Sequence, residues 1–475
     1  MSIALALLNY GAVDLISVSI VTIPIFSLLI VIFVVDGVPD HTRAMMGVGL
    51  AVLAVSIAWV ALQAMPMPGG ILAQASWRNV QGIAAGRLAT ISETPGDDWA
   101  ALLRLALPFG VFLLGLLLFR DDRRAMAALK LLAISGGVIS ILSIGQFYLA
   151  PRTLLFGPKT GYLDSLTGFF VNRNTAATYF GLLALLTGAM AWRLVGETDF
   201  PRLFAAIERL RPLKPDERRH IRRLFWYGSS FLVSVIALVL TKSRAGVGAS
   251  LAAMLVMAVL IALRPSRRAS GSRRSGNGES WNIRRIIVSL AAISLVALFL
   301  LFLAGRVLLR AQVQGVNDTR FCVMPGIVRA VIDHLPWGAG LASFESVFPA
   351  YRDAACGIEN VWDRAHNVYL EGMFSLGLAF PPLLVVVAAG LAWACIKGMR
   401  TRRRFRFAGE AGLSSLLLVA LHSAFDFSMQ ISGLAIFFAA AMAPIVSICT
   451  GTPGRDLERR ADIPDSAPFP QALNS

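Results

Sequence analysis

Long apolar segments recur along almost the whole chain and limit its fold more than any other feature. Segments of roughly 18 to 25 mostly apolar residues are long enough to cross a hydrocarbon layer of about 30 Å. They lie near residues 14–35, 43–65, 99–119, 125–150, 175–195, 224–241, 246–263, 286–305, 368–396, 409–425 and 431–449. Because backbone donors and acceptors in lipid must be satisfied within their own segment, each is expected to be a helix. The sequence therefore predicts an all-α fold, a polytopic membrane bundle of about 11 to 12 transmembrane helices.

The composition points to the same class of protein. Of the 475 residues, 56% are hydrophobic, and a water-soluble protein of that apolarity would have too little polar surface to cover its core. Residues 1–35 have no charged segment at their start and no convincing cleavage site. We therefore expect them to be retained rather than removed as a signal peptide.

Positive charge gathers in a few connecting segments and predicts the orientation. The entire net charge of +16 is carried by residues 120–124, 193–223, 264–285, 397–406 and the tail from residue 450. Since Lys and Arg are enriched in cytoplasmic loops, these segments are predicted to face the cytoplasm. Topology and attraction to anionic membrane lipids explain the excess, so no nucleic-acid partner is expected.

The other connections then fall on the outer side, and the longest of them is the candidate for a small extramembrane domain. An amphipathic stretch from Arg320 to Leu335 predicts helices lying over the membrane surface there. We divide the chain into transmembrane helices with short loops at 1–305, a small periplasmic helical domain at 306–366, C-terminal transmembrane helices at 367–450 and a cytoplasmic tail at 451–475.

Two of the four cysteines, Cys322 and Cys356, lie in that outer domain. An oxidising periplasm would permit a disulfide between them. Their spacing alone does not distinguish a disulfide from two free thiols.

Metal-dependent chemistry has one possible position in the sequence, the adjacent carboxylates of Asp97 and Asp98. One adjacent pair supplies too few ligands for a divalent cation. Asp98 is also expected to cap the N-terminus of the following helix. No metal site is therefore expected.

Many basic residues map to the outer side, where the positive-inside bias disfavours them. They are Arg152, Lys159, Arg173, Lys242, Arg244, Arg306, Arg310, Arg320, Arg329, Arg352 and Arg364. Lys242 and Arg244 stand out because they lie in a tight connection between two apolar segments. A cation there either extends to the lipid headgroups or pairs with an anion. Because guanidinium groups pair bidentately with phosphate oxygens, we expect these residues to hold a diphosphate.

The segment from Arg364 to Glu371 lies where the outer domain re-enters the membrane. A histidine with an ordinary pKa of about 6.5 accepts a proton at neutral pH. His366 is therefore a candidate general base that deprotonates a hydroxyl, with Asn367 or Glu371 orienting the substrate or the ring. Arg364 is a candidate for substrate binding. The alternative is that His366 caps a helix or lies at the interface without a chemical role.

A third segment, Gly168 to Thr175, ends a loop and opens a helix. Either Asn174 or Thr175 could cap that helix. Capping does not explain Arg173, because a cation at a helix N-terminus opposes the macrodipole unless an anion is near. Asn172, Arg173 and Asn174 are therefore candidates for substrate binding.

A fourth segment, Gly338 to Arg352, has a glycine turn followed by aromatic residues. Aromatic faces beside polar groups suit sugar rings, whereas Phe344 and Phe348 are expected to pack the small domain. Tyr351 and Arg352 remain candidates for substrate binding.

Five segments together resemble the O-antigen ligase and O-antigen polymerase (Wzy-type) superfamily. They are FFVNRNTAATYF at 169–180, LTKSRAGVGA at 240–249, residues 320–352 ending in GAGLASFESVFPAYR, DRAHNVYLEGMFSLGL at 363–378 and HSAFDFSMQIS at 422–432. The similarity extends from about residue 165 to residue 435. The order and spacing of the five make it more specific than any one of them.

The resemblance implies a membrane glycosyltransferase of the bacterial inner membrane that works at the periplasmic face without a metal or other cofactor. Its donor would be an undecaprenyl-diphosphate-linked glycan, and its acceptor a hydroxyl of a glycan or of lipid A-core. His366 matches the family's proposed base. Arg244 and Arg320 match the residues thought to hold the diphosphate, and Arg173 matches a further arginine of the pattern.

Direct attack of the acceptor hydroxyl on the donor's anomeric carbon would invert its configuration. The chemistry leaves alternatives open, because a polymerase of repeat units, or a ligase acting on protein hydroxyls, needs the same base and diphosphate site. A transporter of the same lipids would instead need ionisable residues midway along the spans.

Overall fold

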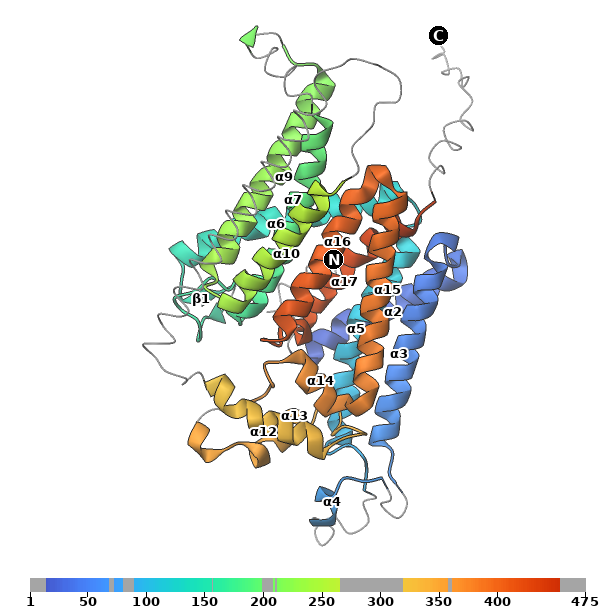
Figure 1. Cartoon of the computed structure of the whole chain (residues 1–475), viewed down its shortest axis with the longest axis vertical. Coiled ribbons are helices and arrows are strands. Elements are labelled where there is room, and N and C mark those ends of the chain that lie inside the picture. The colour runs from blue at the N-terminus through green and yellow to red at the C-terminus, as the bar shows by residue number, and fades with distance from the viewer. Residues whose placement is uncertain are drawn as a thin grey trace, which may run out of the picture.

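The computed structural model describes residues 14–67, 72–79, 89–155, 157–198, 208–209, 212–264, 319–357 and 361–452. Its longer helices are α2 (Leu15–Asp36), α3 (Arg43–Ala64), α5 (Pro95–Leu118), α6 (Asp122–Leu149), α7 (Arg173–Glu197), α9 (Pro215–Leu240), α10 (Arg244–Ala262), α12 (Thr319–Asp333), α15 (Phe380–Thr401), α16 (Arg406–Ser423) and α17 (Ser432–Thr450). Most of them run side by side along the long axis of the molecule (Figure 1).

Short elements connect the long helices. They are η1 (Asp40–Thr42), α4 (Ser76–Asn79), β1 (Thr153–Leu154), β2 (Gly157–Pro158), α13 (Phe344–Val347), η3 (Phe348–Tyr351), η4 (Ala354–Cys356), α14 (Val368–Leu376), η5 (Gly377–Ala379), η6 (Arg403–Phe405) and η7 (Ser428–Gln430). β1 and β2 pair antiparallel, with Thr153 opposite Pro158. This small pair is the only sheet in the described part of the chain.

Nine helices in the described residues are long and apolar enough to cross a membrane. They are Leu15–Asp36, Asp40–Ala64, Pro95–Leu118, Asp122–Leu149, Arg173–Glu197, Pro215–Leu240, Arg244–Ala262, Val368–Thr401 and Ser432–Thr450. The prediction of an all-α, polytopic membrane bundle is confirmed, and the chain is a multi-pass membrane protein. The span expected at 286–305 lies outside the described residues.

The span expected at 409–425 is the helix α16, which is not among those nine. It packs against α7, α10, α15 and α17, so most of its surface meets protein. That enclosure explains why α16 carries Glu410, which is fully buried and pairs with Arg406 at 3.0 Å and with Arg264. Ionisable residues in membrane segments face the interior of the bundle and pair with one another.

Polar side chains at the helix starts explain where several helices begin. The side chains of Asp14, Asp121, Asn172, Ser243 and Asn367 accept hydrogen bonds from backbone N–H groups in the first turns of α2, α6, α7, α10 and α14. These caps satisfy donors that have no partner within the helix. Three of the five capping residues, Asn172, Ser243 and Asn367, lie within segments that the sequence singles out.

Small residues allow the central helices to approach closely. A Cβ on Gly181 of α7 would lie 2.2 Å from the hydroxyl oxygen of Ser250 on α10 and 2.7 Å from Leu418 on α16. On the other side of the bundle, a Cβ on Gly115 of α5 would lie 2.5 Å from Ala443 on α17. Close contact at small residues stabilises helix pairs where the hydrophobic effect is absent. It also fixes the starts of α7 and α10 relative to the end of α16.

A small second core lies at one end of the bundle, where α12, α13 and α14 gather (Figure 1). Its fully buried residues include Val323, Ile327, Phe348 and Phe374. Phe344 stacks on Phe348 with ring centroids 5.0 Å apart. The expectation that Phe344 and Phe348 pack this region is confirmed.

The glycine turn at 338–340 holds this core against the membrane helices. The backbone N–H of Ala339 donates to the carbonyl of Phe374 at 2.7 Å. Gly338 has a φ of 83°, and a Cβ there would lie 2.5 Å from the carbonyl oxygen of Ser375. The side-chain amide of Gln63 on α3 donates to the carbonyls of Trp337 and Ser375. The turn therefore connects the small second core to α14 and to the membrane helix α3.

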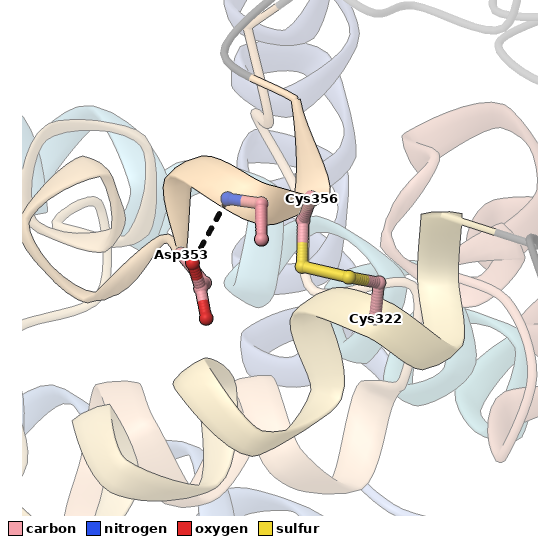
Figure 2. The surroundings of a disulfide bond; sticks show 4 residues. Cys322, Asp353 and Cys356 are labelled. Carbon is pink, nitrogen blue, oxygen red and sulfur yellow. Dashed lines mark hydrogen bonds between the residues drawn. A yellow bond between two sulfur atoms is a disulfide. The ribbon is translucent and has the colours of Figure 1, made fainter.

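Cys322 of α12 and Cys356 of η4 form a disulfide (Figure 2). Of the two alternatives that the spacing left open, the structure shows the disulfide. It closes a segment of 34 residues in sequence and ties the 3-10 turn to the start of α12. Cys395 and Cys449 are free and buried.

Candidate active site

His366 lies directly before α14, at the end of the bundle that carries the outer core. Its ring packs edge-on against Trp362 at 5.4 Å and Phe427 at 4.9 Å between centroids. Its side chain is 21% exposed, and its Nδ1 atom lies 3.8 Å from Oδ1 of Asp426. Nδ1 is buried and forms no hydrogen bond within the described residues. The two aromatic rings therefore hold the imidazole with one nitrogen toward a carboxylate.

Asp426 comes from the connection between α16 and α17, and its side chain is 1% exposed. It accepts hydrogen bonds from the Asn174 amide at 2.7 Å and from the Ser428 hydroxyl. Burial raises the pKa of Asp426, but the neighbouring His366, the charge of His422 and these hydrogen bonds outweigh it, so that the pKa lies below its ordinary value. Asp426 is therefore a carboxylate at neutral pH.

Asn174 links this carboxylate to the start of α10. Its side-chain oxygen accepts a hydrogen bond from the Ser243 hydroxyl at 2.8 Å, while its amide donates to Asp426. The expectation that Asn174 or Thr175 caps α7 is wrong, because Asn172 is the capping residue. Capping by Asn172 places Asn174 in the first turn, where it faces the bundle interior.

The connected residues Ser243, Asn174, Asp426 and His366 come from four segments far apart in the sequence. Three of the four are buried, and the fourth, His366, is half-buried. We call this set the His366 network. It brings together four of the five segments on which the resemblance was based.

Asn367 and Glu371 support the backbone around His366 rather than its ring. Asn367 caps α14 and donates from its amide to the carbonyl of Ala424 at 3.0 Å. Glu371 accepts from the Ala365 backbone at 2.7 Å and from Arg364 at 3.1 Å. Of the two expected roles, orienting the imidazole falls to Asp426, which is the nearby acceptor. A role of Asn367 or Glu371 in orienting the substrate stays a prediction.

Basic residues gather beside the network in the loop that precedes α7 and in the turn between α9 and α10. Lys242 pairs with Asp164 at 3.3 Å. Lys159 donates to the Ser165 carbonyl at 2.6 Å, and burial lowers the pKa of its ammonium group. Arg173 lies over the Tyr162 ring at 5.2 Å. We call Lys159, Arg173, Lys242 and Arg244 the outer basic cluster.

Arg244 is the most exposed arginine of this cluster. It is the first residue of α10 and follows Ser243, a member of the His366 network. In the same way Arg173 precedes Asn174. No carboxylate pairs with Arg244 or Arg173 in the described part of the chain, whose ion pairs involve other residues. The cations and the imidazole therefore share one end of the bundle.

Tyr351 and Arg352, two candidates for substrate binding, are not part of the His366 network or the outer basic cluster. Tyr351 packs against His334 with ring centroids 6.0 Å apart. Burial and a hydrogen bond with Asp333 raise the pKa of Tyr351 to about 12, so it can donate a hydrogen bond but does not act as a base at neutral pH. Arg352 follows it and is half-buried. The Arg320 side chain lies outside the described residues.

The sequence analysis missed Asp426, Ser243 and Arg104. Asp426 and Ser243 lie in segments quoted for the resemblance, but nothing in the sequence pairs them with His366 or Asn174. Arg104 lies about 13 Å along α5 from its first residue, at 1.5 Å per residue. Its Nε atom is buried without a hydrogen bond within the described residues, and its charge is close enough to Arg364 to be repelled by it. Its signal was an arginine inside an apolar span.

The acidic pair at the start of α5 has a structural role. Asp98 is fully buried and accepts from the backbone N–H of Ala342 at 3.0 Å. The expectation that Asp98 caps the helix is wrong, because Thr94 occupies that position and Asp98 lies in the first turn. Asp98 instead anchors the outer segment that follows the glycine turn.

Comparison with known families agrees with this geometry. Residues 229–379 match the family model described as O-Antigen ligase, Wzy_C. This region, about a third of the chain, is therefore similar to the O-antigen ligase family. The match covers the turn with Lys242 and Arg244 and the segment around His366. No curated protein matches the chain.

Proposed function

We propose that the chain transfers a glycan from an undecaprenyl-diphosphate-linked donor to an acceptor hydroxyl at the periplasmic face, as an O-antigen ligase does. The observation that carries this proposal is the single location of the His366 network and the outer basic cluster. A sugar diphosphate needs cations for the leaving group and a base for the nucleophile, and both are available there.

His366 acts as the general base in this mechanism. The Asp426 carboxylate faces the Nδ1 side of the ring and favours the tautomer that carries its proton on Nδ1, which leaves Nε2 free to take a proton. The carboxylate also stabilises the imidazolium that forms. The separation of 3.8 Å between Nδ1 and Asp426 is longer than a hydrogen bond, and such contacts often tighten when substrate binds.

The acceptor oxygen then forms a bond to the anomeric carbon of the donor glycan as its proton moves to Nε2. The bond between that carbon and the diphosphate oxygen breaks, and the diphosphate keeps the electron pair. Attack on the face opposite the leaving group inverts the anomeric configuration. Arg244 and Arg173, with Lys242 and Arg320, stabilise the negative charge that develops on the diphosphate.

A cavity in the membrane part of the bundle suits a part of the hydrocarbon chain of such a donor. It has a volume of about 210 Å³ and is lined by apolar residues of α3, α5, α15 and α17, with Met429 of η7 at one end. Met429 lies three residues after Asp426. Arg104 lies one helical turn from Pro108, which lines the cavity, so the two share a face of α5. An anionic group above an apolar chain fits this arrangement.

The proposed orientation has two supports. The Cys322–Cys356 disulfide lies at the same end as His366, and disulfides persist in oxidising compartments such as the periplasm. Residues 120–124 and 397–406, two of the segments that carry the net positive charge, lie at the other end, as expected for the cytoplasmic face.

The test is transfer by the purified protein in lipid vesicles. Vesicles with an undecaprenyl-diphosphate-linked glycan and a lipid A-core acceptor are expected to yield a new glycosidic bond with inverted configuration and to release undecaprenyl diphosphate. Joining of donor units to each other, with lipid A-core left unmodified, would identify a polymerase instead. Movement of donor lipid across the bilayer without bond formation would identify a transporter and contradict the proposal.

A further inference from the structure

A polar cavity lies at the opposite end of the bundle from His366. It has a volume of about 300 Å³ and lies among α6, α7, α9 and η6. Five basic residues line it: Arg123, Lys130, Arg193, Arg223 and Arg404. We call it the basic-end cavity. Neither the family match nor the proposed transfer reaction gives it a role.

The acidic residues in this cavity pair with only part of its positive charge. Glu197 pairs with Arg193 at 3.0 Å. Asp122 pairs with Arg402, which directly precedes η6 and does not line the cavity. Arg123, Lys130 and Arg223 form no ion pair with a carboxylate in the described part of the chain. The cavity therefore has an excess of cations that is not neutralised from within.

Lys130 makes this excess significant. It lies eight residues after Asp122, or about 12 Å along α6 at 1.5 Å per residue. It is half-buried, and Arg223 and Arg193 are close enough to repel its charge. A cation at this depth is costly unless it pairs with an anion. The cavity therefore suits an anion that the described part of the chain does not supply.

The remaining surroundings of the cavity indicate what carries that anion. Met126, Met190 and Phe407 are buried lining residues, so the cavity has apolar walls beside its cations. On α9 the exposed Phe225 and Trp226 lie two and three residues after Arg223. Aromatic residues favour the level of the lipid headgroups. Cations, apolar walls and interfacial aromatics together suit a phosphate attached to acyl chains.

We propose that the basic-end cavity binds the phosphate group of an anionic phospholipid from the cytoplasmic leaflet. Lys130 and Arg223 contact the phosphate, while Arg123 and Arg404 face it from the neighbouring turns. Basic cavities between membrane helices on the cytoplasmic side bind such headgroups in this way. Binding there would hold α9 against α6 and α7 at the end where α9 extends beyond the rest of the bundle (Figure 1).

The experiment measures lipid binding to the purified full-length protein by native mass spectrometry in detergent. Cardiolipin and phosphatidylglycerol are added in one arm, phosphatidylcholine in a second, and inorganic phosphate or glycerol 1-phosphate in a third. We expect retention of the two anionic lipids and not of phosphatidylcholine. Equal retention of phosphatidylcholine would overturn the proposal. Binding of the soluble phosphates as tightly as the lipids would overturn the lipid assignment.

The variant that tests the site is Lys130→Gln with Arg223→Gln. We expect it to bind anionic lipid roughly a hundredfold more weakly, because each of the two lost charge-assisted contacts contributes about a factor of ten. The matched control is Arg124→Gln with Arg222→Gln. Arg124 and Arg222 lie on the same two helices as Lys130 and Arg223, but they do not line the cavity. Their substitutions remove the same amount of charge. Equal affinity of the two double variants would overturn the proposal. Lys130→Arg keeps the charge and is expected to retain binding, which separates loss of the site from loss of the fold.

Discussion

Strained backbone marks the candidate site at the scale of single residues. Four non-glycine residues in the described part of the chain have positive φ angles: Leu155, Tyr162, Lys242 and His366. Tyr162 lies beneath Arg173, and Lys242 and His366, with φ angles of 54° and 51°, are site residues. Residues other than glycine rarely have positive φ angles, and those that do are often found at functional sites. At His366 this conformation occurs where the ring lies beside Asp426, with Nδ1 3.8 Å from Oδ1.

The charge state of Asp426 gives a prediction about stability and pH. Because the folded-state pKa of Asp426 is lowered, the carboxylate stabilises the fold above its ordinary pKa, and this contribution is lost as the pH falls through the lowered value. Asp426→Asn is therefore expected to melt at a lower temperature than the wild type at pH 7. The difference should narrow as the pH is reduced below about 4. Thermal melts across pH would check it, and a constant difference would contradict it.

Arg244 is expected to be needed for transfer but not for folding. Arg244→Ala is expected to lose transfer by a factor of about 10² or more, because one donor to a developing anion contributes about that much. The fold should persist, since the side chain is exposed and forms no ion pair within the described residues. Vesicle transfer assays check it against Arg329→Ala, which removes an exposed arginine of α12. Equal activity of the two variants would refute the role of Arg244.

The small second core around α12, α13 and α14 is held together in part by its disulfide. The Cys322–Cys356 bond spans 34 residues, and a cross-link of that length stabilises by about 3 to 4 kcal/mol in the chain-entropy account. Cys322→Ser is expected to make residues 319–357 sensitive to protease while the membrane helices stay intact. Limited proteolysis with and without reductant checks this. Equal resistance of the variant and the oxidised wild type would show that the outer core holds without the bond.

The helices could be predicted from the sequence because lipid imposes a length and an apolar composition on each span. α16 shows the limit of that rule, since protein surrounds it and its composition is less apolar. The site was predictable in part. The sequence predicted His366, Arg173 and Arg244 because they are ionisable residues close to apolar segments. The hydrogen bond from Asn174 to Asp426, in contrast, joins positions 252 residues apart. No local periodicity encodes such a contact.

The whole molecule has two polar ends with different roles. One end carries the His366 network, the outer basic cluster and the disulfide; the other carries the basic-end cavity. A cysteine-labelling experiment tests which end faces the periplasm. The two free native cysteines are buried, so they add little background.

Leu163→Cys and Arg403→Cys place exposed thiols at the two ends. A membrane-impermeant maleimide is expected to label residue 163 but not residue 403 in spheroplasts, because the cytoplasmic face is the one with excess positive charge. Disrupted cells, in which both positions should react, are the control. Labelling of residue 403 alone in intact spheroplasts would reverse the orientation and remove the periplasmic site.

The proposed function depends on His366 as the base for glycosyl transfer at the end of the bundle where the cations gather. The most direct measurement is single-turnover transfer in vesicles by the wild type and His366→Ala, with binding of the lipid-linked donor measured in parallel. We predict that His366→Ala binds the donor as the wild type does and transfers it about 10² to 10⁴ times more slowly. Transfer by His366→Ala at the wild-type rate would contradict the account.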